Sequence, residues 1–213
     1  MTEKTKAAPE LDKIQIEAID RSSFLMKGVL AAGATYGAFA AGPILRKAFA
    51  QSGGSEGDIE ILNFALTLEY LESAFYAEAL KEAKLSSEVK ALAELVGGHE
   101  DEHVTALTQT IEDLGGKPVA APGVDFGDAF SSEEAFLALG VTFEDTGVSA
   151  YNGAGPAIES KDILAAAGTI VQIEGRHAAA QRFAAGENPA PNAFDPTLTV
   201  DEVLKAVEPF VKG

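Results

Sequence analysis

Two short motifs of the form Glu-x-x-His constrain this chain more than any other feature. They are Glu100 with His103 and Glu174 with His177, and the chain has one further histidine, His99. On an α-helix, residues three apart project from the same face about one turn from each other. Each motif therefore places a carboxylate and an imidazole side by side, as metal ligands are placed on a helix in a bundle.

Two further glutamates complete a set of six candidate ligands. Glu69 and Glu144 each lie in the middle of a separate helical stretch, on a face that is otherwise apolar. One Glu from each of two helices, with a Glu-x-x-His from each of two others, is the ligand set of a dinuclear carboxylate site inside a four-helix bundle. In the alternative the helices are rotated and these glutamates face solvent. However, on all four predicted helices the candidate glutamate falls on the apolar face. The predicted metal ligands are Glu69, Glu100, His103, Glu144, Glu174 and His177.

Charge balance explains how four acids could share one core. Four carboxylates would repel one another and would be costly to bury without partners. Two neutral imidazoles leave that charge unchanged, whereas two divalent cations neutralise it. The sequence therefore predicts a pair of divalent transition-metal ions.

The candidate ligands belong to an internal repeat of helix pairs. Tyr76 follows Glu69 by seven residues, and Tyr151 follows Glu144 by seven. The two glutamates are 75 positions apart, and the two Glu-x-x-His motifs are 74 positions apart. Each tyrosine hydroxyl is expected either to hold a ligand carboxylate or imidazole in place, or to be the hydrated tip of a core tyrosine.

Two residues near the ligands, Glu72 and His99, have expected roles of their own. Glu72 occupies, on the first helix, the place that histidine takes in the two motifs, so it is either an additional ligand or the partner of a neighbour at the edge of the site. Its counterpart in the repeat is Gly147, so the two halves of the site should differ. His99 lies about 100° around the helix from Glu100. We expect His99 to be a surface or helix-packing residue and not a ligand.

On these residues the chain resembles the ferritin-like superfamily, which includes ferritins, rubrerythrins and related di-iron or di-manganese carboxylate proteins. Within it, the chain looks most similar to exported bacterial ferritin-like domain proteins related to desiccation-associated proteins. The resemblance extends over about residues 56–186. It implies an all-α, ferritin-like four-helix bundle with a long crossover between the second and third helices. It also implies iron or manganese as the metal and O₂ or peroxide as the partner molecule.

The resemblance leaves two functional hypotheses of different classes open. The first is a ferroxidase- or peroxidase-like oxidoreductase that oxidises Fe(II) or reduces O₂ or peroxide. The second is a structural or stress-protective bundle, or a subunit of a homo-oligomer or larger assembly, whose metal site is not catalytic. Oxidation of Fe(II) by the purified protein would separate them.

Helix periodicity and end signals place the bundle at residues 58–186. A capping box at residues 131–134 should open the third helix. Residues 115–131 are too irregular for a helix and fit the crossover. Residues 187–213 should form a Pro-rich loop and a last short helix that begins at a Thr199–Glu202 cap. The four bundle helices are expected at about 58–83, 87–114, 132–153 and 161–185.

The first 50 residues are interpreted as a leader and residues 51–57 as a Gly/Ser linker. A basic flank, an Ala/Gly-rich apolar run and the small-residue site Ala48-Phe49-Ala50 together are typical of a secretory signal. Arg21 is followed by a segment similar to a twin-arginine leader, although Ser22 stands where the second arginine belongs. A cleaved signal, an uncleaved membrane anchor and a helix packed on a partner protein remain as alternatives. We expect an exported protein of the periplasm or cell envelope, in contact with the membrane only if the leader is retained.

Cysteine content and charge exclude several classes of protein. The chain has no cysteine, so it cannot hold disulfides, iron–sulfur clusters or thiol nucleophiles. Its formal charge is −17, and because residues 1–50 carry seven basic and five acidic residues, the remainder carries −19. The strong negative charge of residues 51–213 disfavours nucleic acid or an anionic membrane surface as a partner.

Overall fold

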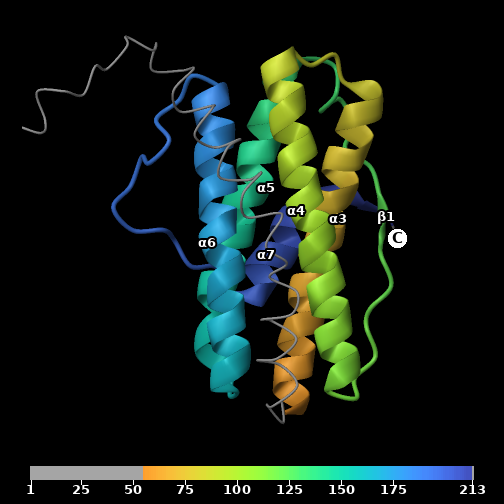
Figure 1. Ribbon diagram of the computed structural model, residues 1–213, viewed down its shortest axis with the longest axis vertical. Helices are drawn as coiled ribbons and strands as arrows, with labels where there is room; N and C mark the ends of the chain where they lie inside the picture. The colour runs from red at the N-terminus through yellow and green to blue at the C-terminus, as the bar shows by residue number, and fades with distance from the viewer. Residues whose placement is uncertain (1–54, 213) are drawn as a thin grey trace, which may run out of the picture.

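The computed structural model describes residues 55–212. Four long helices lie side by side and form a bundle (Figure 1). Helices α3 and α4 pack together as one hairpin, α5 and α6 form a second, and contacts of α3 with α5 and of α4 with α6 join the two. The predicted all-α, ferritin-like four-helix bundle is confirmed. The helices are α3 (Glu56–Glu82), α4 (Ser87–Asp113), α5 (Glu133–Ala154) and α6 (Lys161–Ala184).

The connection from α4 to α5 is the predicted long crossover. It runs along the outside of the bundle from one end to the other (Figure 1), so α4 and α5 point in the same direction. It contains β1 (Gly123–Val124), which pairs antiparallel with β2 (Val211–Lys212) near the end of the chain. Each strand has two residues, too few to produce the alternating pattern by which strands are recognised in a sequence.

The C-terminal segment packs on the second hairpin. Helix α5 ends in the short 3₁₀ helix η2 (Gly155–Ala157), which contains Pro156. After α6, a loop leads to the short helix α7 (Val200–Val207), which contacts α5, and then to the 3₁₀ helix η3 (Glu208–Phe210). The predicted last helix is therefore present, and the β1–β2 pair fastens its end to the crossover.

Side-chain caps fix where the helices begin. Reciprocal capping boxes open α3 and α7, and they pair Ser55 with Asp58 and Thr199 with Glu202. At α5 the predicted box is wrong. Ser132 does accept a hydrogen bond from the Ala135 N–H, but position 135 is the third helical residue, where the box requires Glu or Gln.

Two apolar clusters fill the interior of the bundle. In one, the Phe75 ring centroid lies 5.1–5.5 Å from those of five other aromatic residues. The second is aliphatic and includes Leu66, Leu107 and Ile170. Along α4 and α6, the candidate ligands lie between the residues of the two clusters. Apolar packing on both sides thus holds a polar layer near the middle of these helices.

The predicted leader and most of the predicted linker lie outside the described residues. Among the helices within residues 55–212, none is long and apolar enough to cross a bilayer.

Candidate metal centre

All four bundle helices contribute to one buried cluster of carboxylates and imidazoles. Glu69 from α3, Glu100 from α4, Glu144 from α5 and Glu174 from α6 are 0% exposed. The imidazole of His177 is buried as well, and that of His103 is 12% exposed. The structure therefore brings all six predicted ligands together from residues that are far apart in the sequence.

The ligand atoms form two groups of four that share two glutamates. One group consists of Glu69, Glu100, His103 and Glu174, and the other of Glu100, Glu144, Glu174 and His177. Within each group the ligand atoms lie within 4.8 Å of one another. Glu100 and Glu174 belong to both groups, which is the arrangement expected if these two carboxylates bridge two ions.

Both imidazoles direct Nδ1 into the cluster. The His103 Nδ1 lies 3.1 Å from Glu69 Oε2, 3.0 Å from Glu100 Oε2 and 3.1 Å from Glu174 Oε1. The His177 Nδ1 lies 2.9 Å from Glu100 Oε1 and 3.1 Å from Glu144 Oε2. A ring nitrogen carries one proton or one lone pair, so it cannot hydrogen-bond to all of these oxygens at once.

Several of these carboxylate oxygens have no well-aligned hydrogen-bond partner. Within the described part of the chain, both oxygens of Glu174 and Oε1 of Glu100 are buried and accept no well-aligned hydrogen bond, although imidazole nitrogens lie 3.1 Å from Glu174 Oε1 and 2.9 Å from Glu100 Oε1. A buried carboxylate without a donor costs several kcal/mol unless a cation approaches it. Carboxylate oxygens and imidazole nitrogens together suit iron and manganese. The residues present therefore fit a pair of such ions.

Burial and mutual proximity shift the pKa of each group in the metal-free cluster. Burial raises the pKa of Glu69 to about 7, although the nearby His103 opposes the shift. Burial, reinforced by Glu100 and Glu69, raises the pKa of Glu174 well above its ordinary value. For Glu100, the two imidazoles outweigh burial and hold its pKa below the ordinary value. The metal-free cluster therefore retains protons, which bound cations would displace.

The two tyrosines bond to carboxylates across the bundle. The Tyr76 hydroxyl on α3 donates to Glu144 Oε1 on α5. The Tyr151 hydroxyl on α5 donates to Glu69 Oε1 on α3, at 2.5 Å. Burial and the adjacent carboxylates raise the pKa of both hydroxyls well above the usual range, so both stay protonated donors. Each tyrosine thus holds the glutamate of the other repeat, an exchange that sequence spacing cannot show.

Tyr76 is held in turn by α6. The Gln181 Nε2 donates a hydrogen bond to the Tyr76 hydroxyl, at 2.8 Å. Gly140 on α5 gives this amide room, because a Cβ there would lie 3.1 Å from Gln181 Oε1. The contact of Gln181 with Tyr76 joins residues 105 positions apart, so local spacing in the sequence cannot show it.

Glu72 is a fifth buried carboxylate at the edge of the cluster. Burial and the neighbouring carboxylates, first of them Glu174, raise its pKa well above the ordinary value. It belongs to neither group of four ligand atoms. A Cβ at Gly147 would lie 3.1 Å from Glu72 Oε1 and 3.3 Å from Glu174 Oε2, so glycine on α5 leaves space for this carboxylate.

His99 contacts the cluster from outside. Its Nδ1 lies 2.9 Å from Nε2 of His177, and the two rings are nearly parallel, with an interplanar angle of 15° and centroids 5.1 Å apart, so they meet edge to edge. Burial, with His177 nearby, lowers the pKa of His99 to about 4. His99 is partly exposed and belongs to neither ligand group, in keeping with the expected packing role. Its partner could not be predicted, because the contact joins two helices.

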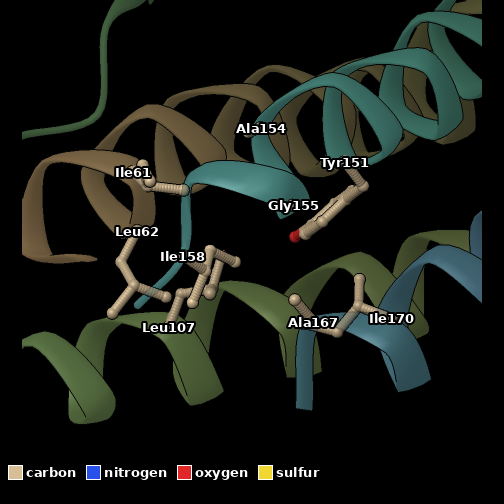
Figure 2. A pocket seen from close by; sticks show the side chains of 9 residues that line it. All are labelled: Ile61, Leu62, Leu107, Tyr151, Ala154, Gly155, Ile158, Ala167 and Ile170. Atoms are coloured by element: carbon tan, nitrogen blue, oxygen red, sulfur yellow. The ribbon is translucent and has the colours of Figure 1, made fainter. Parts of the chain in front are cut away.

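A small apolar cavity lies beside Tyr151. Its volume is about 20 Å³, and Figure 2 shows Tyr151 from α5 on one side with Ala167 and Ile170 from α6 on the other. Its lining is almost entirely apolar, and its volume has room for about one water-sized molecule. Because the Tyr151 hydroxyl also bonds to Glu69, this residue borders both the cavity and the cluster. The lining residues are Ile61, Leu62, Leu107, Tyr151, Ala154, Gly155, Ile158, Ala167 and Ile170.

Fold and cluster together define a class, a four-helix bundle with a buried carboxylate–imidazole centre. Within that class, a family model described as a ferritin-like domain matches residues 57–187, and the chain therefore belongs to the ferritin-like family. No curated protein matches the chain. The narrower likeness to exported, desiccation-related proteins stays a prediction.

Proposed function

We propose that this protein binds two divalent transition-metal ions, iron or manganese, and oxidises Fe(II) or reduces O₂ or peroxide. The observation that carries the proposal is the Glu174 carboxylate. It is fully buried, neither oxygen accepts a well-aligned hydrogen bond within residues 55–212, and it belongs to both groups of four ligand atoms. A carboxyl group in that position must either keep a proton or lie beside cations, and ions shared by the two groups would supply those cations.

Each metal position would be formed by its own glutamate and histidine together with two shared glutamates. Glu100 and Glu174, common to both groups, would bridge the ions. Glu69 and His103 would complete one metal position, and a second glutamate–histidine pair, Glu144 with His177, would complete the other. Tyr76 and Tyr151 orient the two glutamates that are not shared, which limits the positions their oxygens can adopt.

Burial would then control which molecules reach the centre. The four glutamates are 0% exposed, so a reactant bound beside them would be shielded from bulk water. When bound, a pair of redox-active ions would supply the two electrons that reduce peroxide to water, with two protons taken from solvent. The apolar cavity beside Tyr151 favours a small uncharged reactant such as O₂.

Aerobic Fe(II) oxidation tests the proposal. Metal-free protein is mixed with Fe(II) in air, and formation of Fe(III) is followed by absorbance against buffer alone. We expect wild type to accelerate the oxidation and Glu174→Gln to remove the acceleration. Glu102→Gln is the matched control, because Glu102 lies on α4 beside the ligands but is exposed.

Two results would contradict the proposal in different ways. If wild type bound iron and melted at a higher temperature but oxidised Fe(II) no faster than buffer, the metal would be a structural support, as in the alternative hypothesis. If Glu174→Gln oxidised Fe(II) as fast as wild type, the reaction would take place elsewhere on the protein.

We also propose that the protein is exported to the periplasm or cell envelope. The support is the signal-like composition of residues 1–50, which lie outside the described residues. N-terminal sequencing of protein recovered from cell fractions tests this. A mature start at Gln51 outside the cytoplasm is expected, whereas an intact Met1 that is extracted only with detergent would identify an anchor.

A further inference from the structure

Within residues 55–212, the outer ring nitrogen of His177 has a side-chain partner, whereas the outer ring nitrogen of His103 has none. His177 directs Nδ1 at Glu100 and Glu144, and its Nε2 lies 2.9 Å from Nδ1 of His99. His103 also directs Nδ1 into the cluster. Within residues 55–212, however, no side chain or carbonyl accepts a hydrogen bond from Nε2 of His103.

Donor and acceptor roles in the histidine pair follow from this geometry. If Nδ1 of His177 binds a metal ion through its lone pair, the ring proton must be on Nε2. That N–H then donates to His99, whose Nδ1 must be unprotonated and whose own proton is therefore on Nε2. His99 thus fixes both the tautomer and the orientation of His177.

The internal repeat shows that this contact belongs to only one half of the site. The offset of 74 between the two Glu-x-x-His motifs relates His99 on α4 to Ile173 on α6. Isoleucine has no acceptor, so the repeat gives the His103 half no equivalent of His99. The two candidate metal positions, otherwise built from the same residue types, therefore differ in the support behind their imidazoles.

We propose that His99 is a positioning residue that makes the metal position of Glu144 and His177 the tighter of the two. An acceptor on the outer nitrogen of a metal-binding imidazole makes the inner nitrogen a stronger ligand, and the loss of such a partner typically costs 10–100-fold in metal affinity. This inference rests on the proposed dinuclear site. It adds that the two ions bind in sequence, the Glu144–His177 position first.

Two substitutions separate the hydrogen bond from the packing. His99→Phe keeps a flat aromatic ring beside His177 but removes the acceptor. His99→Asn places a carbonyl oxygen close to the position of Nδ1 and keeps the acceptor. Metal-free wild type and both variants are titrated with Co(II) at one fixed pH, and binding is followed by calorimetry and by the visible spectrum of the bound ion. Circular dichroism and thermal unfolding of the metal-free proteins show whether the variants fold.

The structure predicts two resolved binding steps in wild type. In His99→Phe the tighter step should weaken by about 10–100-fold while the weaker step changes little, and His99→Asn should recover most of the loss. A purely structural role would weaken both steps in both variants.

Long-range ¹H–¹⁵N correlation spectra with Zn(II), which is diamagnetic, identify the position that fills first. With less than one equivalent of Zn(II), the His177 ring signals should shift before those of His103, and His99 should carry its proton on Nε2. Equal filling of both positions, a His99 proton on Nδ1, or a His99→Phe variant that binds Co(II) like wild type would overturn the inference and leave the proposed function intact. Failure of wild type to bind any metal would overturn both.

Discussion

At the scale of single residues, the site depends on carboxylates that each have a definite neighbour. Glu144 accepts a hydrogen bond from Tyr76, and its other oxygen lies 3.1 Å from Nδ1 of His177. It therefore stabilises a buried hydroxyl as well as serving as a candidate ligand. Substitutions at this position must separate those two roles to be informative.

Glu144→Gln should weaken metal binding with little effect on the metal-free fold. The amide oxygen can still accept from Tyr76, so the hydroxyl is not left unsatisfied, and one charge leaves a crowded cluster of carboxylates. We expect the melting temperature of the metal-free variant to match that of wild type, and added Mn(II) to raise it far less. Glu144→Ala should also lose about 1–3 kcal/mol of metal-free stability, because the Tyr76 hydroxyl loses its acceptor. Full metal content in Glu144→Gln would remove Glu144 from the ligand set.

Removal of either tyrosine hydroxyl should loosen the carboxylate it holds. Tyr76→Phe frees Glu144 and Tyr151→Phe frees Glu69. Each variant should bind Mn(II) at least about tenfold more weakly, as is common when a partner of a metal ligand is lost. Tyr70→Phe is the control, since Tyr70 lies on α3 among the aliphatic cluster. Unchanged affinity in both cluster variants would show that the tyrosines only fill space.

The raised pKa of Glu69 predicts how metal-free stability depends on pH. Its carboxyl has an ordinary pKa of 4.5 and a folded-state pKa of about 7, so the folded chain binds a proton that the unfolded chain releases between these values. The stability from this proton is complete below pH 4.5 and is lost as the pH rises through about 7. Metal-free protein should therefore melt lower at about pH 8 than at about pH 5.5, and Glu69→Gln should reduce that difference. If the melting temperature of metal-free Glu69→Gln fell with pH as steeply as that of wild type, this assignment would be contradicted. With metal bound the trend should reverse, because ionised carboxylates bind the ions.

At the scale of helices, one buried carboxylate ties the two hairpins together near the start of α3. Asp58 completes the capping box of α3 with Ser55. Its Oδ1 also accepts from the Glu159 N–H at 2.8 Å, and its Oδ2 from the Ser160 N–H at 3.1 Å, just before α6 begins. The beginnings of α3 and α6 are thus held by one side chain that is 1% exposed.

Asp58→Ala should destabilise the protein without removing the metal centre. The loss of a helix cap and of charge-assisted hydrogen bonds to two further N–H groups should cost about 2–4 kcal/mol. Urea unfolding of the metal-free protein should show a lower midpoint at unchanged slope, while the number of metal ions bound per chain stays that of wild type. Glu60→Ala, an exposed neighbour on α3, should have almost no effect. A loss of metal equal to that in Glu144→Gln would mean that the cluster depends on this end of the bundle.

The helices and the clustering of the six candidate ligands were predictable because both depend on local spacing in the sequence. The Glu-x-x-His motifs and the apolar residues at helical intervals depend only on the geometry of one helix. Contacts between helices depend on packing, so the exchange of tyrosine partners and the His99–His177 pair could not be predicted. The β1–β2 pair is likewise too short to leave a pattern, and the box expected at residues 131–134 failed because helix α5 begins one residue later than that pattern requires.

At the scale of the whole molecule, the bundle consists of two similar helix hairpins that differ at a few positions of the site. Each hairpin supplies a glutamate and a Glu-x-x-His motif, and each tyrosine reaches across to the other hairpin. The differences are Glu72, which faces Gly147, and His99, which has Ile173 as its counterpart. Both make the two halves of the centre chemically unequal, which would give two bound ions different surroundings.

The most direct test of this account is the metal content of the native protein. The full chain is expressed with iron and manganese in the medium, purified without chelators, and analysed for metals by mass spectrometry alongside Glu174→Gln. We expect about two iron or manganese ions per wild-type chain and clearly fewer in Glu174→Gln. Wild type that contains only zinc, or that contains no metal after supplementation, would contradict it.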